Sequence, residues 1–428
     1  MNKMNKEFQI EEFIEEYYML NRAPVCSDLT FFTEKIKEII PESKLIKSKS
    51  GDECLSWVIP DAWNVKTATL ENEKREKIID FKNNPLHLIQ YSNSFKGKIN
   101  FNELKKHLFY SKKNPKDIPF IYRKQYEFNR DDSWGFALPY NIFKNLDTNQ
   151  QYYVNIDVKF EKSEIPIIDF MIPGEKEETV FFAAHSCHPA QVNDGIANIA
   201  ILIKLFEWIK NRRNNKFSYR LIIGPEYYAA AVFLAKAKKI NKIQYGMFLD
   251  MMAHKGPIGY ASSYSGNSLV DYIMDKCVKR KFKKFKKYSY RGLWGNDEMF
   301  YDGPDFKIPT IGLGRSGFKN YHLSSDNMNT IDKKSLNDSL DLLKDIILEF
   351  ENSKIFKRKY KGPLYLNRFN VYIDPKKNRQ GYTDLQRIQI SIDGKKSIEQ
   401  ISYELKIDKK FIENFVKELV KKNLISQI

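Results

Sequence analysis

The stretch TVFFAAHSCHPAQVNDGIANIAILIKLFEWIKNR, residues 179–212, decides the fold class of this chain. It opens with a mostly apolar run that ends at His185, which predicts a strand buried on both faces. After a polar loop, residues 196–212 carry apolar side chains at helical spacing and predict a helix. A buried strand followed by a helix is the repeating unit of parallel sheets. This stretch therefore predicts an α/β fold.

The same alternation continues along the chain. Further strands are predicted at 218–225, 243–252 and 308–315, and further helices at 227–239, 268–281 and 334–352. Together they predict a mostly parallel sheet that is flanked by helices on both faces. Ligands of such sheets bind beyond the carboxyl ends of the strands. A functional site is therefore expected at that edge.

Two other regions have different patterns. Residues 61–165 scatter aromatic side chains, proline and asparagine, and predict a small mixed or β-rich domain inserted into the main one. The main domain then comprises residues 1–60 and 166–355. In residues 356–428, Ser397 and Asp408 are N-cap candidates of two short amphipathic helices joined by a tight turn. This pattern predicts a C-terminal winged helix-turn-helix.

The composition is that of a globular protein of two to three domains. The 428 residues are 42% hydrophobic and 29% charged. No apolar run approaches the ~18 residues of a membrane span, and glutamates interrupt the N-terminal segment where a signal peptide would be apolar. The four cysteines have no CxxC spacing. We expect a cytoplasmic protein with no membrane partner.

The net charge of +17 would suit an anionic partner such as nucleic acid. However, most of the excess is lysine, which also simply solubilises a surface. The second C-terminal helix carries Glu413 and Glu418 among its lysines, and Asn414 is its one candidate for reading bases. We therefore expect a packing or interaction module there, with DNA binding as the alternative. A homo-oligomer is compatible with the sequence.

Imidazole and carboxylate side chains follow the ends of successive predicted strands. They are His185, His188 and Asp194 after the first strand, Glu226 after the second, Asp250 after the third, and Asp297, Glu298 and His322 farther along. These are the ligand types that zinc accepts. A single histidine has an ordinary explanation as a strand cap, but a carboxylate such as Asp250 is costly to bury unless it is paired or metal-bound. Their joint recurrence predicts a metal site.

The order His, Asp, Glu, Asp, His resembles that of the co-catalytic zinc aminopeptidases. It occurs here with the motifs NDGIAN at 193–198, LDM at 249–251 and YHLSSD at 321–326. The motif HSCHP at 185–189, with DDSWGF at 131–136, resembles more closely a bacterial family of aminopeptidase-like proteins of unknown function. That family has an inserted domain and a C-terminal winged helix, and the resemblance covers nearly the whole chain.

The resemblance implies that Asp194 bridges two zinc ions. His185 and Asp250 would hold one ion, and Glu226 and His322 would hold the other. His188 is the alternative to His185, because the sequence does not say which imidazole points inward.

In the resembled enzymes a glutamate acts as general base, and it precedes a second glutamate that binds metal. Here the pair is replaced by Pro225-Glu226, which leaves one carboxylate for two roles. If Glu226 is a ligand, Asp297 or Glu298 could act as the base.

Three functions remain in view. The first is a zinc-dependent aminopeptidase-like hydrolase, with one or two ions, that cleaves an amide or an N-terminal peptide bond. The second is a mononuclear zinc amidohydrolase or deacylase that acts on a modified amino sugar or another small amide. The third is a catalytically silent metal-binding or DNA-binding protein.

Overall fold

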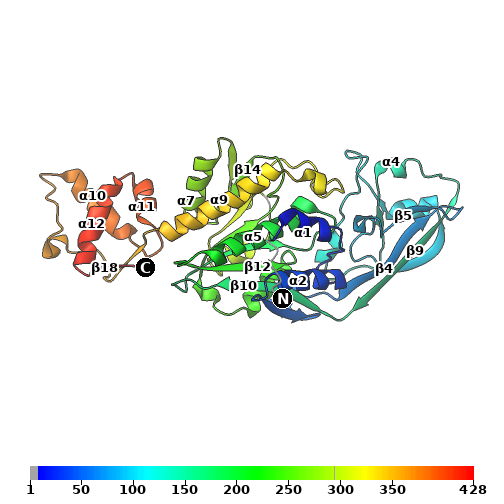
Figure 1. Cartoon of the computed structure of the whole chain (residues 1–428), viewed down its shortest axis with the longest axis horizontal. Coiled ribbons are helices and arrows are strands. Elements are labelled where there is room, and N and C mark those ends of the chain that lie inside the picture. Colours follow the sequence, from blue (N-terminus) through cyan, green and yellow to red (C-terminus); the bar gives the residue numbers. More distant parts are fainter. Residues whose placement is uncertain (1–7, 294) are drawn as a thin grey trace, which may run out of the picture. The chain divides into compact units, whose positions relative to one another are not determined.

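The computed structural model describes residues 8–293 and 295–428, which form two compact units. One unit comprises the chain up to Tyr264 together with Lys284–Asp341. The other comprises Ser265–Lys283 together with Leu342–Ile428. Figure 1 shows the elements in chain order. The domain limits expected at residues 60, 165 and 355 stay predictions.

An eight-stranded sheet forms the centre of the first unit. In spatial order its strands are β1 (Lys44–Lys49), β10 (Glu164–Ile172), β12 (Ser218–Gly224), β11 (Thr179–His185), β13 (Ile243–Leu249), β16 (Thr310–Arg315), β14 (Ile258–Ala261) and β15 (Phe285–Tyr288). The pairs β11–β12, β11–β13, β13–β16 and β14–β15 are parallel. The pairs β1–β10, β10–β12 and β14–β16 are antiparallel. The predicted sheet is therefore confirmed as a mixed sheet with a parallel centre.

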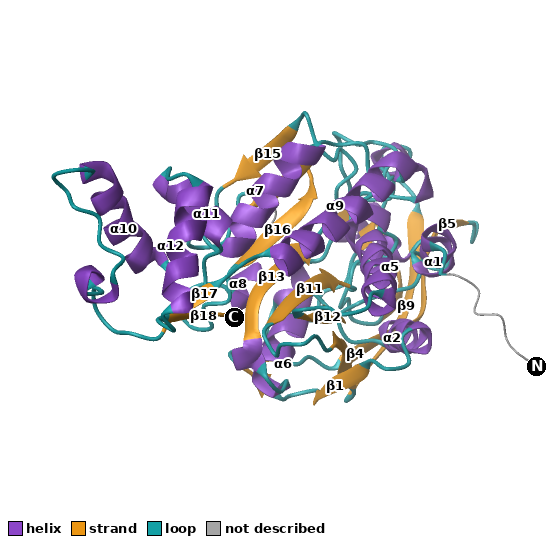
Figure 2. Ribbon diagram, turned by 60° about the vertical axis from the view of Figure 1, so that its left-hand side comes forward, coloured by secondary structure: helices purple, strands orange, loops and turns teal. Residues whose placement is uncertain are grey.

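Helices cover both faces of this sheet, as the sequence predicts (Figure 2). Neighbouring side chains of a strand point to opposite faces. In β11, Phe181 belongs to the core formed with α6 (Tyr228–Lys236), whereas the ring of Phe182 lies 6.0 Å from that of Phe206 in α5 (Ala197–Asn211). The continuous apolar sequence of β11 thus reflects burial on two sides.

The N-terminal helices of this unit are α1 (Ile10–Tyr17) and α2 (Ser27–Ile39). α1 packs against α5, and α2 against β10. The short helix α8 (Glu298–Tyr301) contacts α6 and strands β13 and β16. The helix predicted at 334–352 is α9 (Lys333–Asn352).

The region between β1 and β10 is rich in strands, as expected. Its four-stranded antiparallel sheet runs β5 (Lys77–Asp80), β4 (Ala62–Glu71), β9 (Gln151–Glu161) and β6 (Phe95–Asn100). Two smaller pairs are β2–β3 (Glu53–Cys54, Trp57–Val58) and β7–β8 (Leu108–Phe109, Phe136–Ala137), and two short helices are α3 (Phe101–Leu104) and α4 (Tyr140–Phe143). In Figure 1, β4 and β9 extend away from β10 and β12.

The second unit contains α7 (Leu269–Lys281), the end of α9, and three further helices. These are α10 (Arg379–Ser391), α11 (Ile398–Leu405) and α12 (Lys409–Lys421). Ser397 accepts from the backbone N–H of Gln400 at 3.1 Å, and Asp408 from that of Phe411 at 2.9 Å, so both expected N-caps form. A strand pair, β17 (Phe356–Arg358) with β18 (Ile425–Gln427), closes the segment. The winged-helix assignment itself stays a prediction.

None of the described helices is long and apolar enough to cross a membrane.

Candidate metal centre

Three of the predicted site residues lie where parallel strands end. His185 is the last residue of β11 and pairs with Gly224, the last residue of β12, so Glu226 follows only two residues farther on. Asp250 directly follows β13, which runs parallel to β11. The parallel arrangement therefore brings these three side chains to one edge of the sheet, as the sequence predicts.

Asp194 lies at the centre of the cluster. It belongs to an irregular turn, Val192–Ile196, between β11 and α5. One carboxylate oxygen, Oδ1, lies 3.2 Å from Nε2 of His185, which in turn lies 3.5 Å from Oδ1 of Asp250. The other oxygen, Oδ2, lies 2.9 Å from Nε2 of His322. Asp194 thus faces histidines on both of its sides.

The donor atoms of these residues form two groups that share Asp194. In one group, His185, Asp194 and Asp250 each offer an atom within 4.8 Å of the others. In the other, His188, Asp194 and His322 do the same. The sequence treated His188 as an alternative to His185, but the structure brings both imidazoles to the cluster. A carboxylate with a donor group on each side has the arrangement of a bridging ligand.

The chemistry of this cluster fits a cation. His185 Nδ1, Asp194 Oδ2 and His322 Nε2 are buried without a hydrogen-bond partner among the described residues, although the last two atoms are only 2.9 Å apart. Buried polar atoms are normally paired. No described lysine or arginine forms an ion pair with Asp194 or Asp250. Two buried carboxylates whose charged neighbours are histidines alone are stabilised by a cation, and imidazole with carboxylate is a set that zinc accepts.

Burial and mutual repulsion set the protonation of the cluster. Burial, followed by the charge of Asp194, raises the pKa of Asp250. Burial lowers the pKa of His188 well below its ordinary value, so this imidazole is neutral and able to donate a lone pair. Burial alone would lower the pKa of His185 too, but its contacts with Asp194 and Asp250 raise it well above the ordinary value. A cation bound between them would take the place of that proton.

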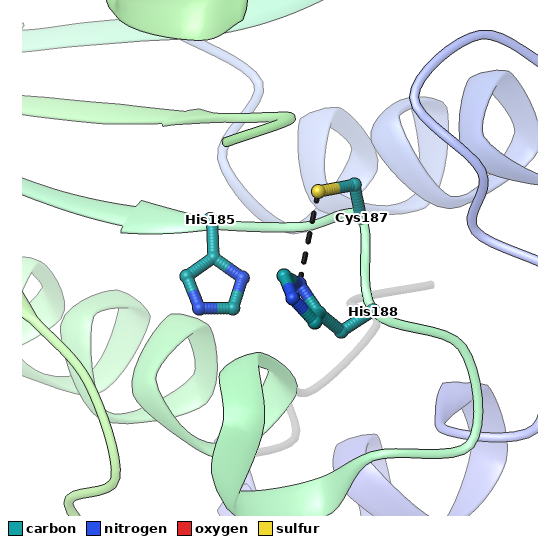
Figure 3. Close-up of side chains that lie close together, drawn as sticks. All are labelled: His185, Cys187 and His188. Carbon is teal, nitrogen blue, oxygen red and sulfur yellow. Dashed lines mark hydrogen bonds between the residues drawn. The ribbon is translucent and has the colours of Figure 1, made fainter. Parts of the chain in front are cut away.

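Cys187 orients the imidazole of His188. Its sulfur lies 3.7 Å from Nδ1 of His188 and accepts a hydrogen bond from the backbone N–H of Glu226 at 3.3 Å. Figure 3 shows the His188 ring beside the ring of His185 and joined by the dashed line to the sulfur of Cys187. Burial raises the pKa of the thiol well above its ordinary value. Donor atoms of His185, Cys187 and His188 lie within 4.8 Å of one another, so the cysteine of the HSCHP motif is a further candidate ligand as well as a neighbour of both histidines.

The candidate general bases differ in what they face. Glu226 lines a cavity of about 310 Å³ that also contains His188, Asp194, Asp250 and His322. Its Oε2 accepts a hydrogen bond from the hydroxyl of Tyr126, and burial raises its pKa. It is not a member of the two donor groups around Asp194. The expected pairing of Glu226 with His322 on one ion stays a prediction.

Asp297 and Glu298 lie beside the cluster but do not line this cavity. Asp297 accepts from the backbone N–H of Tyr227 at 2.6 Å, and Glu298 accepts from that of Asn296 at 3.0 Å. Burial raises the pKa of Asp297 well above its ordinary value and that of Glu298 to about 7. Both carboxyls hold neighbouring backbone in place, so Glu226 is the better placed base.

Several residues that support the ligands were not found from the sequence. The side chain of Asn296 donates to Asp250 Oδ2 at 3.0 Å. Asp326, the last residue of the YHLSSD motif, accepts from the backbone N–H groups of Asn193 and Asp194, each at 3.0 Å. A Cβ on Gly195 would lie 2.7 Å from the ring of His185, so this position needs glycine. Gly195 and Asp326 lie within the quoted motifs and Asn296 does not, but the partners of all three are set by chain packing.

Arg22 joins the N-terminal helix to the HSCHP loop, and no sequence signal marks it. Its side chain is 1% exposed and donates to the carbonyls of Tyr17 and Ser186 at 2.7 and 3.0 Å, and to those of Tyr18 and His188. A guanidinium carries five N–H donors in a fixed plane, which suits a site with several carbonyls. Arg22 therefore fixes the backbone that carries His188.

We expect Arg22→Met to destabilise the protein by about 3–5 kcal/mol, because it leaves buried carbonyl groups without donors. Arg22→Lys should reduce the stability less, because lysine keeps the positive charge although it lacks the planar set of N–H donors. Urea denaturation measures both, and Arg213→Met, at an exposed position, is the matched control. Equal stability of Arg22→Met and Arg213→Met would contradict the role of Arg22.

Comparison with known proteins agrees with this fold. The profile of a family described as Domain of unknown function (DUF4910) matches residues 11–353. A protein of Clostridium acetobutylicum, provisionally named a polysaccharide biosynthesis protein with an aminopeptidase-like domain, is 29% identical over 351 residues, which are 81% of this chain and 79% of that protein.

Two solved structures extend the comparison. A crystal structure of a provisionally assigned peptidase from Clostridium acetobutylicum has a TM-score of 0.78 at 26% identity and covers 98% of this chain and 96% of that chain. A zinc aminopeptidase from Bacillus subtilis has a TM-score of 0.56 at 11% identity and covers 81% of this chain and 96% of that chain. The second likeness concerns the fold alone. The fold is that of a peptidase-like hydrolase.

Proposed function

Since this chain belongs to the DUF4910 family and has a peptidase-like hydrolase fold, we propose that it is a zinc-dependent hydrolase of an amide bond. One observation carries the proposal. Donor atoms from three separate segments, 185–188, Asp250 and His322, converge on Asp194, and buried polar atoms among them have no hydrogen-bond partner within the described residues. The metal implied by the resemblance to zinc aminopeptidases thus finds a fitting set of side chains.

Under this proposal His185, Asp194 and Asp250 hold one ion, and His188 and His322 are placed to hold a second with Asp194. Zinc supplies Lewis acidity, which polarises a carbonyl and lowers the pKa of water. Glu226 faces the cavity and takes up a proton as general base, with Tyr126 fixing the direction of its carboxylate. Tyr122, Tyr126 and Tyr321 line the same cavity, so the bound amide is partly shielded from water.

Two substrate classes are compatible with this arrangement. The simplest is a peptide with a free N-terminus, as expected from the resemblance to aminopeptidases. The second is the amide of a modified amino sugar, with a single zinc ion. Two facts favour this second class. Pro225-Glu226 replaces the usual glutamate pair, and the Clostridium acetobutylicum relative has a provisional name that refers to polysaccharide biosynthesis.

The proposal predicts zinc-dependent hydrolysis. Purified protein loaded with zinc is assayed for release of p-nitroaniline from leucine p-nitroanilide and for release of acetate from N-acetylglucosamine. We expect turnover of one of them, loss on chelation and recovery when zinc is restored. N-acetyl-leucine p-nitroanilide is the control that tests whether a free amine is required. Activity that survives complete removal of metal would contradict the proposal.

The number of ions separates the two forms of the proposal. Metal analysis of the same preparation is expected to give about two zinc ions per chain if both groups around Asp194 are used, and about one for a mononuclear amidohydrolase. A chain that takes up no zinc after repletion would instead support a catalytically silent protein.

A further inference from the structure

A second, larger cavity adjoins the metal centre within the same unit. It has a volume of about 750 Å³, which lies in the range of small-molecule sites. Tyr126 lines both cavities, and its hydroxyl bonds to Glu226. The walls come from the β2–β3 hairpin, the segment 126–132, the end of β9 and the start of α6. Tyr126 therefore stands between the metal centre and this cavity.

Aromatic rings form part of its wall. Trp57 is held by perpendicular ring contacts with Tyr228 at 5.3 Å and with Tyr126 at 6.3 Å. Phe128 is 75% exposed, so its ring is open to contact with a ligand. These rings offer apolar faces with a negative quadrupole, which attract weakly positive C–H groups.

Polar groups stand beside these rings. The carboxylates of Glu127 and Asp132 have no hydrogen-bond or ion-pair partner within 8–293 and 295–428. Over the same ranges, the indole N–H of Trp57 and the hydroxyl of Ser56 have no partner either. The wall thus carries both acceptors and donors without partners.

The charge of this cavity is opposite to that of the whole chain. Its lining has four carboxylates, Asp61, Glu127, Asp131 and Asp132, but only two cations, Arg130 and Lys162. Both cations are already engaged: Lys162 pairs with Asp61 at 2.8 Å, and Arg130 lies 4.2 Å from the centre of the Tyr91 ring and donates to the carbonyl of Lys124. Asp131 pairs with Lys124 at 3.0 Å, so Glu127 and Asp132 are the lining carboxylates without an ion-pair partner among the described residues, and in a protein of net charge +17 their charge disfavours phosphates and other anions here.

We propose that this cavity binds the glycosyl part of the substrate, whose amide reaches the metal centre past Tyr126. The inference rests on the proposed amide hydrolase and names its substrate class as an amide-bearing sugar. A sugar ring has an apolar C–H face that packs on Trp57 or Phe128, and hydroxyl groups that both donate and accept. A basic peptide would also use the carboxylates, and its backbone carbonyls would accept from Trp57 and Ser56, but it has no rigid C–H face to stack on the exposed rings.

Binding of sugars tests this without relying on hydrolysis. Cellobiose, which has no amide, and N,N′-diacetylchitobiose are titrated into the zinc-loaded and the metal-free protein by calorimetry, with tri-lysine as the competing ligand class. We expect both disaccharides to bind in either state and to bind more tightly than tri-lysine. Phe128→Ala should weaken disaccharide binding about fivefold to tenfold through loss of ring stacking. Asp132→Asn should weaken it less, because an amide still accepts a hydrogen bond.

Tyr365→Ala, which removes an aromatic ring that is 73% exposed outside this cavity, is the matched control and should bind as the wild type does. Failure of both disaccharides to bind, equal affinities in Phe128→Ala and the wild type, or tighter binding of tri-lysine would each overturn the inference. Disaccharide binding without hydrolysis of any amide would overturn the proposed function and leave the sugar site standing. Hydrolysis of a small amide without disaccharide binding would overturn the sugar site and leave the proposed function standing.

Discussion

Replacing Asp194 with asparagine is expected to reduce hydrolysis at least about a thousandfold, equivalent to ~4 kcal/mol of barrier, and to remove most of the bound zinc. The amide has nearly the shape of the carboxylate, so the turn between β11 and α5 should remain. The Asp194→Asn variant loses the negative charge that faces His185 on one side and His322 on the other. A neutral amide oxygen is a much weaker zinc ligand than a carboxylate.

Asp305→Asn is the matched control for this substitution, because Asp305 is exposed and lies outside the cluster. Activity, zinc content and thermal stability are measured on both variants. The control should match the wild type in all three. An Asp194→Asn variant that keeps both its zinc and its activity would show that Asp194 is not a ligand.

The second large effect concerns Glu226. Replacement by glutamine should lower kcat by about 10²–10⁴-fold while the zinc content stays unchanged, because an amide cannot take up a proton. The geometry supports this role, since Glu226 faces the cavity and stands outside the two donor groups around Asp194. Glutamine can still accept the hydrogen bond from Tyr126, so the side chain should keep its place.

Tyr126→Phe separates positioning from proton transfer. It removes the hydroxyl that bonds to Glu226 but keeps the ring, so a smaller loss of kcat is expected than for Glu226→Gln. Loss of zinc in parallel with activity in Glu226→Gln would make this residue a ligand instead. Full activity of that variant would transfer the role of base to another carboxylate, with Asp297 the next to test.

The α/β fold could be predicted because strand and helix periodicities are local properties of the sequence. The apolar run that ends at His185 and the run before Asp250 each identify a strand and its carboxyl end. Parallel pairing then brings those ends together without any further information. For the same reason the sequence alone predicts that His185, Glu226 and Asp250 lie at one edge of the sheet.

What the sequence could not supply is the packing of segments that have no periodicity. Arg22 contacts a loop more than 160 residues away, and Tyr126 reaches Glu226 from the region between β1 and β10. Hydrogen bonds of this kind depend on the final position of loops, and a loop sequence specifies that position only through tertiary contacts. The choice between His185 and His188 was open for the same reason, and the structure places both beside Asp194.

The most direct test is anomalous diffraction from crystals grown with zinc. Data are collected on both sides of the zinc absorption edge. We expect an anomalous peak about 2.0–2.2 Å from Nε2 of His185 and from carboxylate oxygens of Asp194 and Asp250. A second peak between Asp194, His188 and His322 would add the second ion. Absence of any peak at Asp194, or peaks only at other histidines, would contradict the central claim that these side chains form one metal centre.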